Sequence, residues 1–271
     1  MFFDAHVHSK ASPDSDMNPI DAIHILQKKG LGVTFTEHVD FAAPLNAGYD
    51  PEAPDIPHRE NTPFVCDFDM YPKDYRSLRS GSVLLGLEIG LTAAFLRRNS
   101  ELANSGDFDF ILGSIHTVNG RDMYNEFPVD KDSGDVVSRY LTYAKKMVEQ
   151  CGFFDSLTHI DFIARYKKYV SERFKYDNYS REFDALLKAL IENDKVLEIN
   201  TERLGDTKAR KSLLPIYTRF AELGGKYCTV GSDAHQTENL GRNFKHAYKL
   251  AKAAGLQIVY YKERKRYISG N

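Results

Sequence analysis

Short apolar runs typical of β-strands alternate with runs of helical periodicity along the whole chain, and this alternation constrains the fold most. Strands are predicted at residues 2–8, 32–36, 83–89, 108–114, 155–158, 195–199 and 226–230. Strands connected through helices make right-handed crossovers, so the pattern predicts an α/β fold with a parallel sheet covered by helices. Periodicity alone does not decide whether that sheet is open or closed into a barrel. The length of 271 residues allows one barrel or two smaller domains.

The helical segments have typical capping and terminating residues and apolar stripes. The first helix is predicted from Pro19, with Asn18 as its N-cap and Gly30 as its stop. Another helix is expected to open at Pro215 and to end at Gly224. Apolar stripes predict the remaining helices within residues 137–148, 183–191 and 244–253. A short apolar run at residues 257–261 follows the last of these.

One segment, residues 40–71, fits neither element type. Five of the ten prolines of the chain lie in it, and a sixth, Pro72, follows directly. A loop of this length in a compact domain usually forms a lid or binding loop, or else stays mobile. We expect a lid-like loop at residues 40–71, with a mobile segment as the alternative.

Composition and charge exclude several classes of function. The 36 Lys and Arg and the 38 Asp and Glu give a net charge of −2, and no basic run is interleaved with aromatic residues, so we expect no nucleic-acid partner. No apolar run reaches the roughly 18 residues of a membrane helix, and Asp4 and His6 interrupt the stretch that a signal peptide would keep apolar. Cys66, Cys151 and Cys228 contain no CxxC pair, which argues against a disulfide framework or a thiolate zinc site. We expect a cytoplasmic protein without a membrane anchor.

Metal-competent side chains gather at the predicted strand ends. His6 and His8 form an HxH pair on the first strand, where residues two apart share a face. By itself, such a pair is more often incidental than a metal site. Further residues of this kind end later strands: His38, Glu88, His116, His159, Asp233 and His235. Parallel sheets and barrels build active sites at the carboxyl ends of their strands, so the pattern predicts a metal site there.

The alternative is that these histidines are scattered core or surface residues. Six of the nine histidines fall at strand ends, which random placement would not produce. The other three, His24, His58 and His246, lie in predicted helices or in the long loop. We interpret them as ordinary, with His58 either solvated or in contact with substrate. Cys151 and Cys228 are interpreted as packed apolar groups.

The strand-end residues belong to motifs that resemble those of a known family. DAHVHSKASPD, TEH, GLEIG, GSIH, HID and GSDAH occur in this order over nearly the whole chain. This set resembles the motifs of the polymerase and histidinol phosphatase (PHP) superfamily. The chain length, the long loop and the segment EINTERLG are similar to those of its monofunctional histidinol-phosphate phosphatases. The resemblance implies a single domain over residues 1–271, folded as a distorted seven-stranded (β/α)7 TIM-like barrel with up to three divalent ions.

The resemblance also implies a ligand set for each ion. The first ion would be held by His6, His8, Glu88 and Asp233. Glu88 would bridge to a second ion, held also by His116 and His159. The third ion would be held by Asp14, His38 and His235, with Asp16 as the alternative to Asp14. All these positions carry metal-competent side chains, and a donor set without thiolates leaves Zn, Fe and Mn open as the metal.

This arrangement suits the hydrolysis of a phosphate ester. Three divalent ions would carry six positive charges against three from Asp14, Glu88 and Asp233, so the site would attract anions. A water on the ions bridged by Glu88 would have its pKa lowered from about 15.7 towards about 7, giving hydroxide for in-line attack on phosphorus. The ions would also neutralise charge on the phosphoryl oxygens. The implied reaction converts L-histidinol phosphate to L-histidinol and phosphate in histidine biosynthesis, with Glu88 and Asp233 as catalytic residues and Asp233 or a bound water as the leaving-group acid.

Arginines at the same rim are candidates to bind the phosphate, because a planar guanidinium is a bidentate donor. Arg203 follows the sixth predicted strand, Arg165 follows the fifth, and Arg121 after GSIH is a weaker third candidate. Each could instead form a surface ion pair. Three residues that share strand faces with ligands are candidates to orient the imidazoles: Asp4, Asp161 and Asn200.

Other functions stay open at this point. A PHP relative could hydrolyse another small phosphoester or a protein phosphotyrosine. The barrel amidohydrolases also begin with HxH, but they usually need eight strands and a bridging lysine carboxylate, whereas Glu88 takes the bridging role here. A non-catalytic module would bind metal and release no phosphate from any phosphomonoester. The sequence does not indicate the oligomeric state.

Overall fold

The computed structural model describes residues 1–42, 65–67, 70–119, 121–123, 135–165 and 168–270. Its central feature is a nine-stranded sheet in the order β1-β2-β3-β4-β7-β8-β9-β10-β11. Neighbouring strands are parallel except β10 and β11, which are antiparallel. The strands of this sheet are β1 (Phe2–Val7), β2 (Leu31–Val39), β3 (Val83–Gly90), β4 (Phe110–Ser114), β7 (Ser156–Leu157), β8 (Val196–Asn200), β9 (Tyr227–Gly231), β10 (Gln257–Lys262) and β11 (Lys265–Ile268). A separate ribbon pairs β5 (Thr117–Val118) with β6 (Arg121–Asp122).

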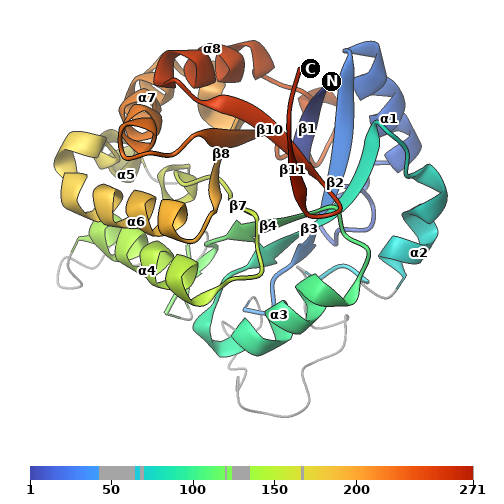
Figure 1. The fold of residues 1–271 in the computed structure, drawn as a ribbon, viewed down its shortest axis with the longest axis horizontal. Helices are drawn as coiled ribbons and strands as arrows, with labels where there is room; N and C mark the ends of the chain where they lie inside the picture. The colour runs from blue at the N-terminus through green and yellow to red at the C-terminus, as the bar shows by residue number, and fades with distance from the viewer. Residues whose placement is uncertain (43–64, 68–69, 120, 124–134, 166–167, 271) are drawn as a thin grey trace.

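Helices surround the strands on their outer side (Figure 1). They are α1 (Pro19–Lys28), α2 (Tyr71–Tyr75), α3 (Leu96–Ser105), α4 (Val136–Gln150), α5 (Lys168–Arg173), α6 (Ser180–Glu192), α7 (Thr207–Glu222) and α8 (Phe244–Ala254). The predicted cap of the first helix is confirmed, because Asn18 Oδ1 accepts a hydrogen bond of 2.9 Å from the Ile20 amide. The predicted α/β fold with a largely parallel sheet is therefore confirmed.

Two details of the predicted elements need correction. Pro215 does not open its helix: α7 begins eight residues earlier at Thr207, where Asp206 accepts a hydrogen bond from the Lys208 amide. The reason is a buried stripe that starts ahead of the proline, at Ala209 and Leu213, and outweighs the backbone hydrogen bond that Pro215 removes. The apolar run at residues 257–261 is itself a strand, β10, which extends the sheet beyond the seven predicted strands.

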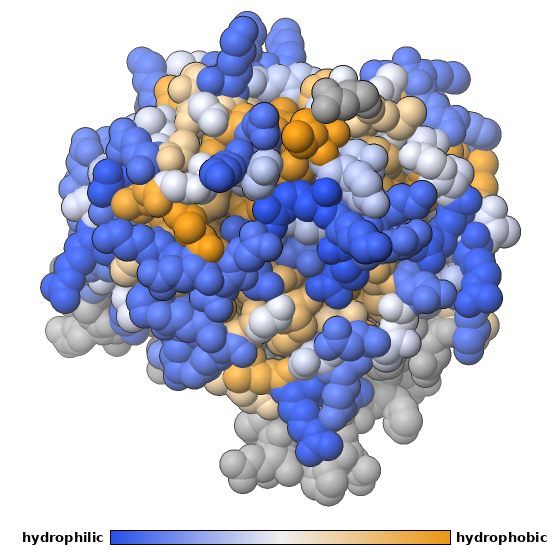
Figure 2. Space-filling view, viewed as in Figure 1, coloured by the Kyte–Doolittle hydropathy of each residue, from blue (hydrophilic) through white to orange (hydrophobic). Residues whose placement is uncertain are grey.

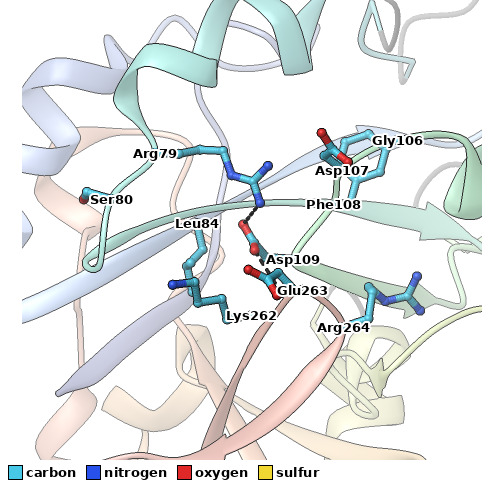
Figure 3. A pocket seen from close by; sticks show the side chains of 10 residues that line it. All are labelled: Arg79, Ser80, Leu84, Gly106, Asp107, Phe108, Asp109, Lys262, Glu263 and Arg264. Carbon is cyan, nitrogen blue, oxygen red and sulfur yellow. Dashed lines mark hydrogen bonds and ion pairs between the residues drawn. The ribbon is translucent and has the colours of Figure 1, made fainter.

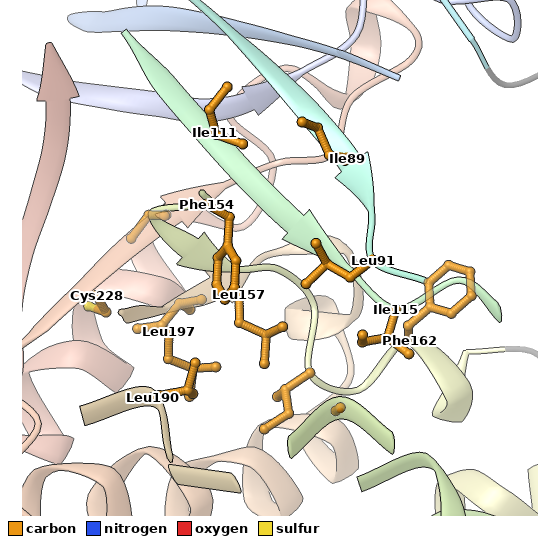
Figure 4. Close-up of a cluster of buried hydrophobic side chains, with 14 of the residues drawn as sticks. Ile89, Leu91, Ile111, Ile115, Phe154, Leu157, Phe162, Leu190, Leu197 and Cys228 are labelled. Atoms are coloured by element: carbon orange, nitrogen blue, oxygen red, sulfur yellow. The ribbon is translucent and has the colours of Figure 1, made fainter. Parts of the chain in front are cut away.

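The core lies between the strands and the helices. Every residue of β2 and β3 is buried, as expected for strands that are covered on both faces. Ile111, Phe154 and Leu157 from the strand region pack in one cluster with Leu190 of α6 (Figure 4). All four side chains are at most 1% exposed. This packing fixes the strand positions on which the strand-end side chains depend.

The first strand also contacts the segment that follows β9. The Asp233 amide donates a hydrogen bond of 2.8 Å to the carbonyl of His6, and the His8 amide donates one of 2.9 Å to the carbonyl of Ala234. Val7 and Ala234 form a parallel bridge. The motif GSDAH is therefore held directly beside the HxH pair.

The hairpin β10–β11 lies across the end of the sheet where the strands begin. β10 pairs with the start of β9, with Gln257 opposite Tyr227. Further along, the ring of Tyr261 stacks on that of Phe110, the first residue of β4, with centroids 5.1 Å apart. Arg264 forms a two-point ion pair with Asp155, next to β7, with Nε–Oδ2 and Nη2–Oδ1 distances of 2.8 and 3.0 Å. The hairpin thus covers this end of the sheet.

A cavity of about 590 Å³ lies at the same end, between the hairpin turn and the starts of β3 and β4 (Figure 3). Within it, Arg79 Nη2 lies 2.8 Å from Asp109 Oδ2. Asp109 also accepts hydrogen bonds of 3.0 Å from the amides of Leu85 and Glu263. These contacts fasten the hairpin turn to the strand starts, at the end of the sheet opposite the metal-competent side chains.

The face of the molecule seen in Figure 1 carries mostly hydrophilic residues, with apolar residues in small separate groups (Figure 2). None of the helices in the described part of the chain is long and apolar enough to cross a membrane. The loop predicted at residues 40–71 falls mainly outside the described residues. Of its described ends, Val65 forms an antiparallel bridge with Val39, the last residue of β2.

Candidate metal centre

His6 and His8 point into the interior from the end of β1. Both side chains are fully buried, and their Nε2 atoms lie 3.0 Å apart. Glu88, near the end of β3, places Oε2 3.3 Å from both of these nitrogens. Asp233 adds Oδ1 at 3.4 Å from His6 Nε2 and 3.5 Å from His8 Nε2. Side chains from three distant parts of the sequence thus converge on one point, as predicted.

The second carboxylate oxygen of Glu88 faces another group of imidazoles. Glu88 Oε1 lies 2.9 Å from His159 Nε2 and 3.3 Å from His116 Nε2. Ser114 Oγ donates a hydrogen bond of 2.6 Å to the same oxygen. In each of the two clusters, one ligand atom from every residue lies within 4.8 Å of the others. Glu88 therefore has the geometry of a bridge between two cation sites.

A third cluster forms around His38 and His235, whose Nε2 atoms lie 3.2 Å apart. Asp14 places Oδ2 3.3 Å from His38 Nε2 and 3.2 Å from His235 Nε2, so Asp14, the first choice for this position, meets these imidazoles. The structure also brings His8 into this cluster, with its ring stacked on that of His38 at 4.0 Å. Every residue of the predicted ligand set therefore lies in one continuous group.

The backbone of Asp233 contributes to this convergence. Its φ of +55° lies in the left-handed region, which residues other than glycine rarely adopt. Asp4 stabilises the turn, since its carboxylate accepts hydrogen bonds from the amides of Ser232 (2.8 Å) and Gly241 (2.9 Å). Strained backbone held by surrounding contacts is common at functional sites.

The electrostatics of the cluster favour bound cations. Burial lowers the pKa of His6, but the carboxylates of Asp233, Glu198 and Glu88 outweigh it and raise this pKa well above its usual value. Burial raises the pKa of Glu88, but the imidazoles, His6 first among them, hold this pKa well below its usual value. Among the described residues, the buried Glu88 Oε2 has no hydrogen-bond partner of suitable geometry, although imidazole nitrogens surround it. Nitrogen and carboxylate donors arranged in this way suit Zn²⁺, Fe²⁺ or Mn²⁺.

Two carboxylates that sequence reasoning missed orient the imidazoles. Glu198 Oε1 lies 2.8 Å from His6 Nδ1, and Asp40 Oδ2 lies 3.0 Å from His116 Nδ1. An ionised carboxylate only accepts hydrogen bonds, so Nδ1 of each imidazole donates one to it. In the neutral ring, the lone pair is then on Nε2, which faces the cluster. Strand alternation could have identified Glu198, because it shares a face with Asn200.

The three predicted orienting residues act differently from one another. Asn200 Nδ2 lies 3.2 Å from Asp233 Oδ2 and 3.2 Å from a Glu198 oxygen, so it supports two carboxylates of the site. Asp4 is a correction: its carboxylate faces the segment after β9, where it accepts from backbone amides instead of an imidazole. Asp161 is also a correction, because its carboxylate binds Arg203 at 2.7 Å.

The candidate arginines lie beside the cluster. Arg165 Nη1 donates to Asp233 Oδ2 at 2.8 Å and lies 2.6 Å from Glu202 Oε2. Arg203 donates to Asp161 and, at 2.7 Å, to Ser171 Oγ. Both arginines line a cavity of about 910 Å³ between α5, the turn Glu202–Gly205 and α7. Arg121 lies in β6, and its side chain is outside the described part of the structure.

The remaining histidines lie away from these clusters or outside the description. His24 is on α1 and His246 on α8, as interpreted from the sequence. His58 falls outside the described residues. Cys66, Cys151 and Cys228 are buried free thiols.

Comparisons of sequence and of structure with known proteins point to the same group of proteins. A model of the PHP domain matches residues 4–202. The chain is 38% identical to a probable histidinol-phosphatase of Clostridium acetobutylicum, over 97% of this chain and 98% of the relative. It is 28% identical to a histidinol-phosphatase of Lactococcus lactis, over 93% of this chain and 91% of the relative. A crystal structure of the Lactococcus lactis histidinol phosphate phosphatase, complexed with zinc, L-histidinol and phosphate, superposes with a TM-score of 0.83 at 26% identity, covering 98% of both chains. The chain therefore belongs to the PHP domain family.

Proposed function

We propose that this protein is a metal-dependent phosphomonoesterase that hydrolyses L-histidinol phosphate to L-histidinol and phosphate, a step of histidine biosynthesis. The observation that carries the proposal is the position of Glu88, whose two oxygens face two separate imidazole clusters. Bridged cations are the usual means of activating water against a phosphate ester. The relatives named above carry the same activity in their names.

The proposed ligands divide among three cations. The first set is His6, His8, Glu88 and Asp233; the second is Glu88, His116 and His159; the third is Asp14, His38 and His235. When bound, the cations supply Lewis acidity and a hydroxide at neutral pH. The protein fixes the donor atoms by burial and by hydrogen bonds from its own side chains.

Asp233 is proposed to take part in proton transfer, and Arg165 is proposed to bind the phosphate. Arg165 and Asn200 hold Asp233 Oδ2, which leaves Oδ1 facing the first cluster. Asp233 or a bound water is the proposed group to protonate the leaving oxygen. Arg165 and Arg203 offer guanidinium groups to the non-bridging phosphate oxygens.

Arg203→Ala is expected to raise KM for the phosphate ester by about 10-fold or more, since a hydrogen bond to a charged group contributes about 1.5–3 kcal/mol. Metal content is expected to stay unchanged, because Arg203 contacts Asp161 and Ser171 and no proposed ligand. Initial rates and elemental analysis measure both quantities. The matched control is Arg97→Ala, at an arginine 92% exposed on α3. Unchanged kinetics in the Arg203 variant would remove this residue from the site.

The proposal also covers the closure of the sheet into a barrel and the role of the long loop. We infer that the seven parallel strands β1–β4 and β7–β9 form the wall of a distorted TIM-like barrel over a single domain, supported by the bonds between the end of β1 and the segment after β9. The loop at residues 40–71 would serve as a lid. A cytoplasmic location fits the buried free cysteines.

A phosphate-release screen tests the function directly. Histidinol phosphate, a phosphotyrosine peptide, nucleoside monophosphates and sugar phosphates are each assayed with Mn²⁺, Zn²⁺ and Fe²⁺. We expect histidinol phosphate to give the highest kcat/KM by at least about tenfold, which corresponds to a barrier difference of about 1.4 kcal/mol. Preference for another ester would make the protein a PHP phosphatase of different specificity. Bound metal without phosphate release from any ester would favour a non-catalytic module.

A further inference from the structure

Glu37 is a fully buried carboxylate beside the metal centre that the proposed chemistry does not use. It precedes His38 in β2, and neighbouring strand residues point to opposite faces. Its partners lie in the loop after β1. Ser9 Oγ donates to Oε1 at 2.6 Å, Ser12 Oγ donates to Oε2 at 2.6 Å, and the Ser9 amide lies 3.1 Å from Oε2. These donors fix the position of both carboxylate oxygens of Glu37.

The hydroxyl of Ser12 connects Glu37 to His8. A hydroxyl has one proton to donate and two lone pairs with which to accept. The Ser12 proton is used on Glu37 Oε2. One lone pair accepts from the His38 amide, at 2.9 Å. The remaining contact, His8 Nδ1 at 3.3 Å from Ser12 Oγ, therefore has to be donated by the imidazole.

This count of protons fixes the tautomer of His8. A neutral imidazole carries its proton on one nitrogen, and burial disfavours the charged ring. With the proton on Nδ1, the lone pair is on Nε2. That atom lies 3.0 Å from His6 Nε2 and 3.3 Å from Glu88 Oε2, at the point where the first and third clusters meet. The tautomer set by Ser12 is therefore the one that can bind a metal ion.

We propose that Glu37 is a positioning residue that acts through Ser12 to hold His8 in the Nδ1-protonated tautomer, so that Nε2 is available to a divalent cation. The proposal rests on the metal centre described under the proposed function. Glu37 would affect metal affinity through two hydrogen bonds, one to Ser12 and one from His8 to Ser12. This effect is separate from any effect on folding.

Glu37→Gln changes the direction of these hydrogen bonds while keeping size and shape. When the new amide nitrogen faces Ser12, it donates to Oγ, and the hydroxyl proton turns towards His8 Nδ1. The imidazole then carries its own proton on Nε2 and cannot bind a cation there. We expect metal affinity to fall by about 10- to 100-fold, the usual effect of changing a residue that orients a ligand.

The experiment uses the full chain at pH 8. Zn²⁺ affinity is measured by competition with a chromophoric chelator, and the His8 tautomer is read from imidazole ¹⁵N shifts of the metal-free protein. Wild type is expected to show Nδ1–H, and Glu37→Gln a mixture with Nε2–H. Tyr75→Phe is the matched control: it removes the hydroxyl 2.7 Å from Ser9 Oγ on the other side of the carboxylate and should change neither readout.

Two results would overturn the proposal: an Nε2-protonated His8 in the wild type, or a folded Glu37→Gln variant with wild-type affinity and tautomer. If that variant does not fold, Ser12→Ala decides, because it removes the acceptor of His8 Nδ1 and should weaken Zn²⁺ binding while Glu37 is retained. Failure of the metal centre itself is distinguishable, since wild type would then bind no Zn²⁺ while the tautomer measurement could still be made.

Discussion

Glu88→Gln is expected to lower turnover by about 10³-fold or more and to reduce the metal content below that of the wild type. A change to a residue that only orients a ligand typically costs about 10- to 100-fold, and Glu88 itself contacts both imidazole clusters. The amide keeps the size of the side chain but loses one acceptor oxygen and the negative charge. It would also leave the surrounding imidazoles without the carboxylate that compensates them. Elemental analysis and phosphate release measure the two effects on one preparation.

Glu101→Gln is the matched control, because Glu101 is 63% exposed and pairs with Arg97 on the surface of α3. This variant should keep wild-type metal content and turnover. A Glu88→Gln protein with near-normal rates would contradict the assignment of Glu88 as a bridge. Lost activity with full metal content would instead show that the carboxylate is needed for the chemistry and not for binding.

Removal of divalent ions by a chelator is expected to abolish phosphate release and to lower the melting temperature by about 10 °C. A ligand present at a thousand times its Kd stabilises the folded state by about 4 kcal/mol, and 1 kcal/mol shifts Tm by about 2–4 °C in a protein near this size. Adding back Mn²⁺, Zn²⁺ or Fe²⁺ should restore both properties. Activity that survives dialysis against chelator, with metal absent by elemental analysis, would disprove the metal-dependent mechanism.

The chelated protein should also lose stability as the pH rises from 7 to 9. Burial opposes protonation of His116, but Glu88 and Asp40 outweigh it and raise its pKa to about 9. A group whose pKa is raised on folding stabilises the protein below its unfolded pKa, near 6.5, and this contribution is lost as the pH passes the folded value. Thermal melts of metal-free protein at pH 7 and 9 measure this loss. Bound cations replace the protons, so the metal-loaded protein should show a smaller change.

The convergence of the metal-competent side chains was predictable from sequence because parallel strands bring their carboxyl ends together. Once His38, Glu88 and His159 are placed at strand ends, their convergence follows from topology alone. The residues that orient these ligands were harder to predict. Glu37 accepts a hydrogen bond from Ser12 in the loop after β1, and Asp40 meets His116 across 76 positions of sequence. Such contacts depend on loop conformation, which periodicity does not describe.

Sequence signals for helix starts and strands also gave wrong or undecided predictions where long-range packing determines the secondary structure. Pro215 has the typical signature of a helix start, yet the apolar stripe on both sides of it keeps α7 continuous. The run at residues 257–261 was too short to classify as a strand or a helix by periodicity. It becomes β10 because the start of β9 offers an edge to pair with and Phe110 offers a ring to stack on.

The hairpin β10–β11 is fastened over the end of the sheet where the strands begin. The metal-competent side chains come from the other end, where β1, β2 and β3 finish and the segment after β9 runs beside His8. The two ends of the same strands therefore serve different purposes: one end anchors the sheet, and the other carries the residues of the proposed chemistry.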